Sequence, residues 1–169
     1  EIEEMLGICQ KEGVTGVGAK VLYYDDTVRH AGVVLGTRQL IEYVFSGIDN
    51  KNDGYLQRPR INCNYSAVSG LCMLVKKEVF IGNNGFNETI DDGISDVEFC
   101  YRIRGEEKRI VYAASAQWKM CMGIKENYRI KKSISTESKR FLKVISDIDD
   151  PYYNKNFSKQ TKAFSVLFK

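Results

Sequence analysis

The 169-residue chain lacks the features that would place it in a membrane or in an oxidising compartment. No apolar run approaches the roughly 20 residues that a membrane-spanning helix needs. The first residues, EIEE, are acidic where a secretory leader would be basic. The five cysteines are odd in number and have no C-x-x-C spacing, which argues against a disulfide framework or a zinc site. We therefore expect a cytoplasmic protein with reduced, mostly buried thiols.

Composition and length are those of one globular domain that covers residues 1–169. Hydrophobic residues make up 43% of the chain and charged residues 28%, so a sizeable core is expected. The charge is unevenly distributed: residues 125–169 hold 11 basic and 5 acidic side chains, and residues 1–124 hold 14 and 17. This basic region either forms a solvated helix face or contacts an anionic partner. It contains no recognised nucleic-acid reader motif, so no nucleic-acid partner is expected.

Hydrophobic periodicity predicts alternating helices and strands. Helices are expected over residues 1–13, from 76 onward, over 94–104 and over 133–149. The last helix and the tail that follows it form a basic C-terminal region, residues 134–169. Strands are expected over 14–24, 29–36, 71–75 and 108–118, the third of them buried. The alternation indicates an α/β protein with a mixed sheet flanked by helices.

Two acidic residues stand at the start of the helix that reads ISDVEFCYRI. Ser95 and Glu98 fit the S-x-x-E capping box, and Asp96 would then be the first helical residue, where the helix dipole favours a carboxylate. This local chemistry accounts for both acids without any function. The alternative is that Asp96, held ionised and aimed outward, serves as a general base.

Six segments resemble family 2 glycosyltransferases, nearest to the bacterial rhamnosyltransferase-like branch, and they occur in the family's order along the whole chain. They read EMLGICQKEGVTGVGAKVLYYDDTVRHAGVVLG, NYSAVSGLCMLVKKEVF, GFNE, SDVEFCYRIR, RIVYAASA and DPYYNKNFS. The resemblance implies a GT-A fold (the nucleotide-diphospho-sugar transferase type), of which this chain would be the C-terminal, acceptor-side part. The N-terminal nucleotide-binding half would be absent.

The resemblance also implies an activity and a set of site residues. Family members transfer a sugar, usually with inversion, from a nucleotide-sugar donor to an acceptor, here a polysaccharide or lipid-linked glycan of the bacterial cell envelope. By the match to SDVE, Asp96 would be the catalytic base, with Glu98 and Arg102 in support. By the match to NYSAVSG, Ser69 and Gly70 would contact the donor sugar or the acceptor.

The chain departs from the family pattern where a metal would bind. The family's D-x-D pair, which holds Mg²⁺ or Mn²⁺ and the donor diphosphate, would precede this chain. Asp147–Asp149 has the letters but is expected at a helix end, and Asp25–Asp26 is expected in a hairpin turn. Met120 and Cys121 stand where family members commonly carry a histidine, and soft sulfur ligands suit these cations poorly. The cation is therefore expected in the full-length parent and not on this chain.

The remaining polar and aromatic candidates have a structural and a functional interpretation. His30, the only histidine, is expected to be a structural residue at a strand end. Trp118 either faces the acceptor or joins the core. Tyr152, Tyr153 and Phe157 either stack on an acceptor sugar or pin the tail to the core.

A second function remains open from the sequence. The missing metal motif and the basic C-terminal region fit a non-catalytic module that binds an acceptor or an anionic membrane surface, at the inner face of the cytoplasmic membrane. A sheet that lacks half of its fold would also expose an edge and an apolar face, which predicts self-association.

Overall fold

The computed structural model describes residues 1–121, 134–160 and 163–164. Its elements follow one another as α1 (Ile2–Cys9), β1 (Val14–Leu22), β2 (Val28–His30), β3 (Val33–Leu35), β4 (Ile41–Tyr43), η1 (Tyr55–Arg60), β5 (Cys63–Tyr65), η2 (Gly70–Cys72), β6 (Met73–Val75), α2 (Lys77–Gly82), α3 (Ser95–Ile103), β7 (Arg109–Lys119) and α4 (Thr136–Ser146). The two η elements are short 3₁₀ segments. The predicted α/β class is confirmed.

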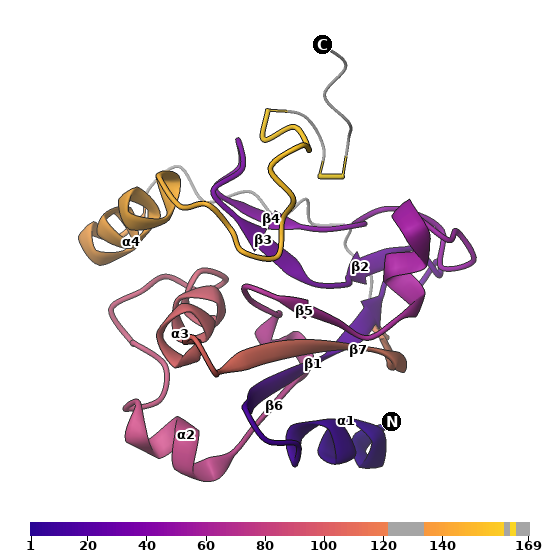
Figure 1. The fold of residues 1–169 in the computed structure, drawn as a ribbon, viewed down its shortest axis with the longest axis horizontal. Coiled ribbons are helices and arrows are strands. Elements are labelled where there is room, and N and C mark those ends of the chain that lie inside the picture. The colour runs from indigo at the N-terminus through magenta and orange to yellow at the C-terminus, as the bar shows by residue number, and fades with distance from the viewer. Residues whose placement is uncertain (122–133, 161–162, 165–169) are drawn as a thin grey trace.

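A mixed sheet forms the centre of the molecule (Figure 1). Its strand order is β2-β1-β7-β5, and β6 also pairs with β1. The long strands β1 and β7 run parallel, whereas β2, β6 and β5 pair antiparallel with their neighbours. Strands β3 and β4 make a separate two-stranded sheet.

Two apolar clusters cover the two faces of the central sheet. The smaller joins Met5, Ile8 and Cys9 of α1 to apolar residues of β1 and β7. The larger cluster contains apolar residues of α3, α4 and the β3–β4 sheet. Strand β1 is buried along its whole length because both of its faces are covered, which explains its nearly continuous run of small and apolar residues.

Most predicted elements are present, with three differences. The strand expected over 29–36 divides at Gly32 into β2 and β3, which belong to different sheets. Gly32 has φ 111°, and a Cβ there would lie 2.3 Å from the Tyr65 ring, so the chain turns where only glycine fits. The strand expected over 71–75 begins with a 3₁₀ turn, and β6 is only half-buried. Of the five cysteines, only Cys9 and Cys100 are buried.

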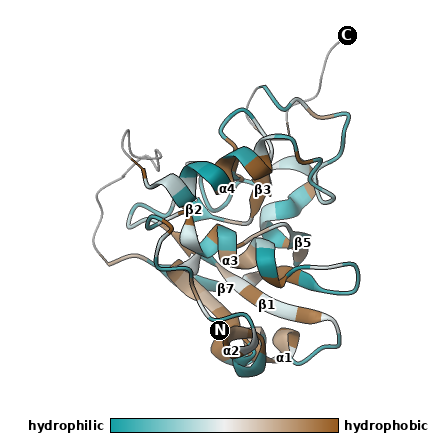
Figure 2. Ribbon diagram, turned by 90° about the vertical axis from the view of Figure 1, so that its left-hand side faces the viewer, coloured by the Kyte–Doolittle hydropathy of each residue, from teal (hydrophilic) through white to brown (hydrophobic). Residues whose placement is uncertain are grey.

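The turn predicted at Asp25–Asp26 and the helix end predicted at Asp147–Asp149 are both found in the structure. Asp25–Asp26 lies in the tight turn between β1 and β2, where Asp26 has φ 63°. The last described helix, α4, is shorter than predicted but buries the expected residues Phe141, Leu142 and Ile145. Figure 2 shows α4 with hydrophilic residues along its outer side. Asp149 follows this helix and is exposed. Among the described residues, no helix has the length and apolarity required to cross a bilayer.

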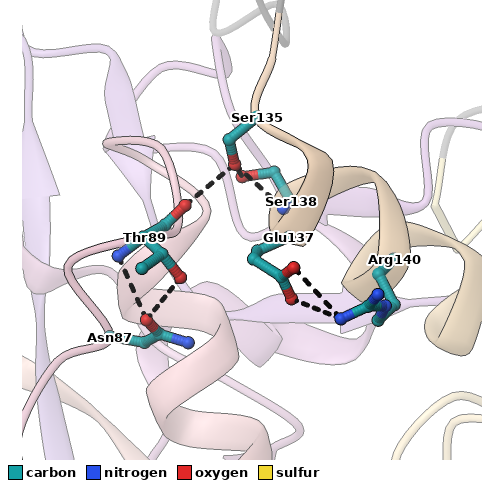
Figure 3. A network of polar contacts seen from close by, with 6 residues as sticks. All are labelled: Asn87, Thr89, Ser135, Glu137, Ser138 and Arg140. Atoms are coloured by element: carbon teal, nitrogen blue, oxygen red, sulfur yellow. Dashed lines mark hydrogen bonds and ion pairs between the residues drawn. The ribbon is translucent and has the colours of Figure 1, made fainter.

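Side chains at the start of α4 fix it to the loop that leads into α3 (Figure 3). Ser135 accepts a hydrogen bond from the Ser138 amide at 3.0 Å and donates one to the Thr89 carbonyl at 2.9 Å. Asp91 accepts from the Ser135 amide and from the Ser138 hydroxyl, at 2.7 and 2.6 Å. These bonds lower the pKa of Asp91. The loop before α3 is thereby positioned by the start of a helix 44 residues further along the chain.

Candidate active site

The candidate site is built around the 66–70 loop, which connects β5 to η2. The loop packs directly on β1: a Cβ on Gly18 would lie 2.4 Å from the Cβ of Val68. Ser66 and Ser69 are buried, whereas Gly70 is exposed. The close approach to a glycine on the central strand holds the loop against the sheet and leaves its last residue at the surface.

Asp96 borders this loop from the first turn of α3 and is 9% exposed. Its Oδ2 accepts a hydrogen bond from the Gly70 amide at 2.7 Å, and its Oδ1 accepts one from the Val97 amide at 2.8 Å. Burial raises the pKa of this carboxyl group, and the hydrogen bonds from Gly70, Val97 and Ser69 oppose that rise. A Cβ on Gly70 would lie 3.1 Å from the Cβ of Asp96, so the glycine permits the close approach.

The predicted capping box does not form. Ile94 precedes the helix without a side-chain cap, and the side chain of Glu98 pairs with Arg102 instead of returning to Ser95. Asp96 is also turned toward the 66–70 loop and not outward as expected. The predicted capping box is therefore wrong. Asp96 does lie in the first turn of the helix, as expected, but its side chain binds Gly70 of the 66–70 loop, and Glu98 pairs with Arg102 one turn along the same helix.

His30 holds the same loop from its other side. It ends β2, as predicted, and is completely buried against the rings of Tyr43 and Tyr112. Its Nε2 accepts from the Ser69 amide at 3.2 Å, and its Nδ1 lies 3.4 Å from the Gly32 amide. Burial, with a smaller effect of Arg29, lowers the pKa of His30 to about 3. Two consecutive amides of the loop, those of Ser69 and Gly70, are thus held by a neutral imidazole and by a carboxylate.

Three of the predicted site residues, Ser69, Gly70 and Asp96, are therefore brought together. Ser69 also caps η2, where its Oγ accepts from the Leu71 amide at 3.3 Å. The exposed position of Gly70 places the edge of this group at the molecular surface. A buried carboxylate beside a surface loop is an arrangement that can take up a proton from a bound hydroxyl.

Glu98 and Arg102 lie on the same helix but are engaged in holding another loop. Their side chains form an ion pair of 2.7 Å, and Arg102 donates to the carbonyls of Asn83 and Gly85. The guanidinium lies over the Phe99 ring at 5.3 Å. These contacts give both residues a structural role, and their predicted part in sugar binding stays a prediction.

Trp118 lies near the carboxyl end of β7, in register with Val21 of β1, and its side chain is 39% exposed. No contact within the described residues joins it to the 66–70 loop. Met120 and Cys121 come just after the end of β7 and are half-buried and exposed respectively. Within the described part of the chain, no three acidic, histidine or cysteine side chains are grouped to hold a metal ion.

The C-terminal aromatics pin the tail to the core. Of the two interpretations given above, this is the structural one. Tyr153 is buried, and its ring and that of Phe157 both pack against Phe164. Asp150, which starts this tail, was not predicted to have a role: it is buried and accepts from the amides of Leu35 and Tyr152 at 2.7 and 2.9 Å. A signal was present, since an Asp just before Pro151 is typical of a turn in which the carboxylate binds the backbone.

Comparison with known proteins gives two distant relatives. The chain is 28% identical to the uncharacterized protein y4gI of Sinorhizobium fredii over 96% of its own length and 19% of that protein. It is 30% identical to the O-antigen biosynthesis protein RfbC of Myxococcus xanthus over 69% of its own length and 9% of that protein. The chain thus spans less than a fifth of either relative. No family model and no solved structure matches it.

Proposed function

We propose that this chain is the acceptor-side part of a family 2 glycosyltransferase with a partial GT-A fold, and that Asp96 is its catalytic base. The observation that carries the proposal is the placement of Asp96: a buried carboxylate held beside the exposed Gly70 by a short hydrogen bond. The similarity to an O-antigen biosynthesis protein supports a role in making a surface polysaccharide. The transfer would take place at the cytoplasmic side of the membrane.

As the catalytic base, Asp96 would remove one proton from the acceptor. A carboxylate oxygen takes the proton of the acceptor hydroxyl while that hydroxyl oxygen bonds to the anomeric carbon of the donor. The bond from that carbon to the diphosphate breaks on the opposite face, and its electron pair leaves with the diphosphate, so the configuration inverts. The carboxylate accepts the amides of Gly70 and Val97 and the hydroxyl of Ser69, and the acceptor hydroxyl would join these donors when it gives up its proton. A raised pKa strengthens the base.

The described residues of this chain do not fit the divalent cation that such enzymes use. The described residues offer no cluster of acidic or histidine ligands, and Met120 and Cys121 are soft ligands at the place where the family carries a histidine. The Mg²⁺ or Mn²⁺ that accompanies the nucleotide-sugar donor would then be held by residues other than the described ones.

Substitution of Asp96 tests the proposal, provided that activity is separated from folding. Asp96→Asn in the longest form of the protein that contains these residues should lower sugar transfer by about 10²–10⁴-fold. It should also cost about 1–3 kcal/mol of stability, because one backbone amide loses its acceptor. Transfer would be followed with radiolabelled nucleotide-sugars and cell-envelope acceptors, and stability by urea unfolding.

Asp150→Asn is the matched control. Asp150 is also buried, at 4% exposed against 9% for Asp96, and also accepts two backbone amides, but those of Leu35 and Tyr152, and it anchors the tail. It should lose comparable stability and retain transfer activity. An Asp96→Asn protein that is folded and remains as active as Asp150→Asn would contradict the assignment of Asp96 as the base.

A second function, a non-catalytic module that binds an acceptor glycan or an anionic membrane surface, is supported by one feature of the same residue. Both oxygens of Asp96 already accept backbone amides, which is also what a purely structural carboxylate does. This alternative predicts salt-sensitive binding to vesicles that contain anionic lipid, with no loss of binding in Asp96→Asn. Absence of binding at low salt would eliminate it.

A further inference from the structure

Lys20 is a buried lysine without an anionic partner. It lies near the end of β1 and is 2% exposed, yet no hydrogen bond or ion pair joins its ammonium group to any residue of the described chain. Burying an unpaired ammonium group is costly, and a lysine of this kind is usually paired or reserved for a ligand. The Nζ of Lys20 is not among the fully enclosed polar atoms that lack a partner in the described residues, so it keeps some contact with solvent. The described residues supply no anion to it, and the group is open to a ligand.

The side chain of Lys20 is on the face of the sheet that carries the candidate site. Alternate residues of a strand face the same side, and Gly16 and Gly18 precede Lys20 at that spacing. Gly18 faces Val68 of the 66–70 loop, and Gly16 faces Ile103 of α3. Lys20 is thus one step further along the same face, beyond the loop that Asp96 and His30 hold.

The position of Lys20 is also the end of a parallel strand pair. Lys20 is in register with Gln117 of β7, two residues before β1 ends. In α/β sheets, ligands bind outside the carboxyl ends of parallel strands. Figure 1 shows this end of β1 and β7 beneath η1, away from α3.

The polar groups around Lys20 are incompletely satisfied. Asn50 donates to the Gln117 side chain at 3.2 Å, and its own Oδ1 is buried without a donor. Arg60 is near enough for its charge to lower the pKa of Lys20 further, beyond the larger effect of burial. Arg60 is itself paired with Asp53, so it supplies only part of a second positive charge. A ligand here would have to bring negative charge toward Lys20 and could bring a hydroxyl toward Asn50.

We propose that Lys20 binds a phosphate oxyanion at the carboxyl end of β1 and β7. A phosphate group fits better than a carboxylate because its larger charge matches Lys20 and the partly neutralised Arg60 together. Either a nucleotide diphosphate or a lipid diphosphate would present this group. The inference goes beyond the proposed transfer reaction, because Lys20 has no part in proton removal by Asp96.

Binding of inorganic pyrophosphate to the 169-residue chain tests the proposal without any measurement of transfer. Titration calorimetry at constant ionic strength should show binding to the wild type, and Lys20→Met should weaken it at least tenfold. Lys77→Met, which removes an exposed lysine from α2, is the matched control and should bind as the wild type does. UDP and a polyprenyl diphosphate in detergent micelles, compared with pyrophosphate, distinguish the two sources of the group.

Stability provides a second readout that remains informative if a variant binds poorly for other reasons. Lys20→Met should unfold at a higher temperature than the wild type when no anion is present, since an unpaired charge is removed. Pyrophosphate should raise the unfolding temperature of the wild type and leave that of Lys20→Met unchanged. Equal binding by both proteins, or no binding by the wild type at about 10 mM pyrophosphate, where a site of at least millimolar affinity would be filled, would overturn the proposal. Neither result would bear on the role of Asp96.

Discussion

His30 has the most perturbed environment of any single residue in the candidate site. It is the only histidine of the chain, it is completely buried, and it accepts a hydrogen bond from Ser69. Its pKa of about 3 lies below the 6.5 of an exposed histidine, so the unfolded chain binds this proton more readily than the folded chain does. Stability should therefore be highest above pH 6.5 and fall as the pH decreases toward 3.

The expected slope is about 1.4 kcal/mol per pH unit once the pH is well below 6.5. Urea unfolding of the wild type between pH 7 and pH 5 would measure it. His30→Gln should be less stable than the wild type at pH 7 but should lack this slope, because no other histidine titrates in the chain. The raised pKa values of Asp96 and Asp150 act in the opposite direction at lower pH, so the comparison stops at pH 5. Parallel pH profiles for the two proteins would exclude His30 as the cause.

Among the elements, α4 has the best-defined start. Ser135 accepts from the Ser138 amide and is bonded to the Thr89 carbonyl, so one side chain both caps the helix and fixes the loop that leads to Asp96 (Figure 3). Ser135→Ala should cost about 1–2 kcal/mol, measured by thermal or urea unfolding. Ser146→Ala, at the exposed end of the same helix, is the control and should change stability by less than about 0.5 kcal/mol. Equal losses in both variants would show that the cap contributes nothing specific.

The comparison of sequence with structure shows which elements local patterns can predict. Apolar spacing predicted α4 because it buries one regular set of residues, and a continuous apolar run predicted β7 because both of its faces are covered. The pattern around Ser95 predicted a capping box that does not form. Glu98 pairs instead with Arg102, one turn further along the same helix, and Asp96 accepts from Gly70, a partner distant in sequence. Such partners depend on how α3 packs against the 66–70 loop, and a helix considered alone contains no record of that packing.

The same limit applies to the site as a whole. The resemblance to a family selected Ser69, Gly70 and Asp96, and the structure brings these three together. It gave no role to Lys20, whose isolation becomes visible only when both faces of β1 are seen to be covered. An unpaired charge is a property of the folded molecule, so residue types and spacing alone cannot reveal it.

At the scale of the whole molecule, one end of the structure exposes several large apolar side chains. Helices α1 and α2 lie at this end in both views (Figures 1 and 2), and Lys76 at the start of α2 contacts the carbonyl of Lys11 just after α1. The exposed apolar residues of these helices and the segments beside them are Ile2, Leu6, Leu71, Phe80, Ile81 and Phe86. Several exposed apolar side chains at one end of a molecule are typical of a surface that contacts another protein.

We expect this surface to bind a second copy of the chain at high concentration. Sedimentation velocity from about 10 to 300 µM, a range chosen to reveal the micromolar-to-millimolar affinities of weak contacts, should then show a rising average sedimentation coefficient for the wild type. Ile81→Glu places a charge on a residue that is 61% exposed, so it should abolish association with little effect on folding. Leu56 on η1 is 72% exposed, more than Ile81, and the control variant Leu56→Glu should associate as the wild type does. If Leu56→Glu reduces association as much as Ile81→Glu does, the contact is a general effect of apolar exposure and the α1–α2 end has no special part in it.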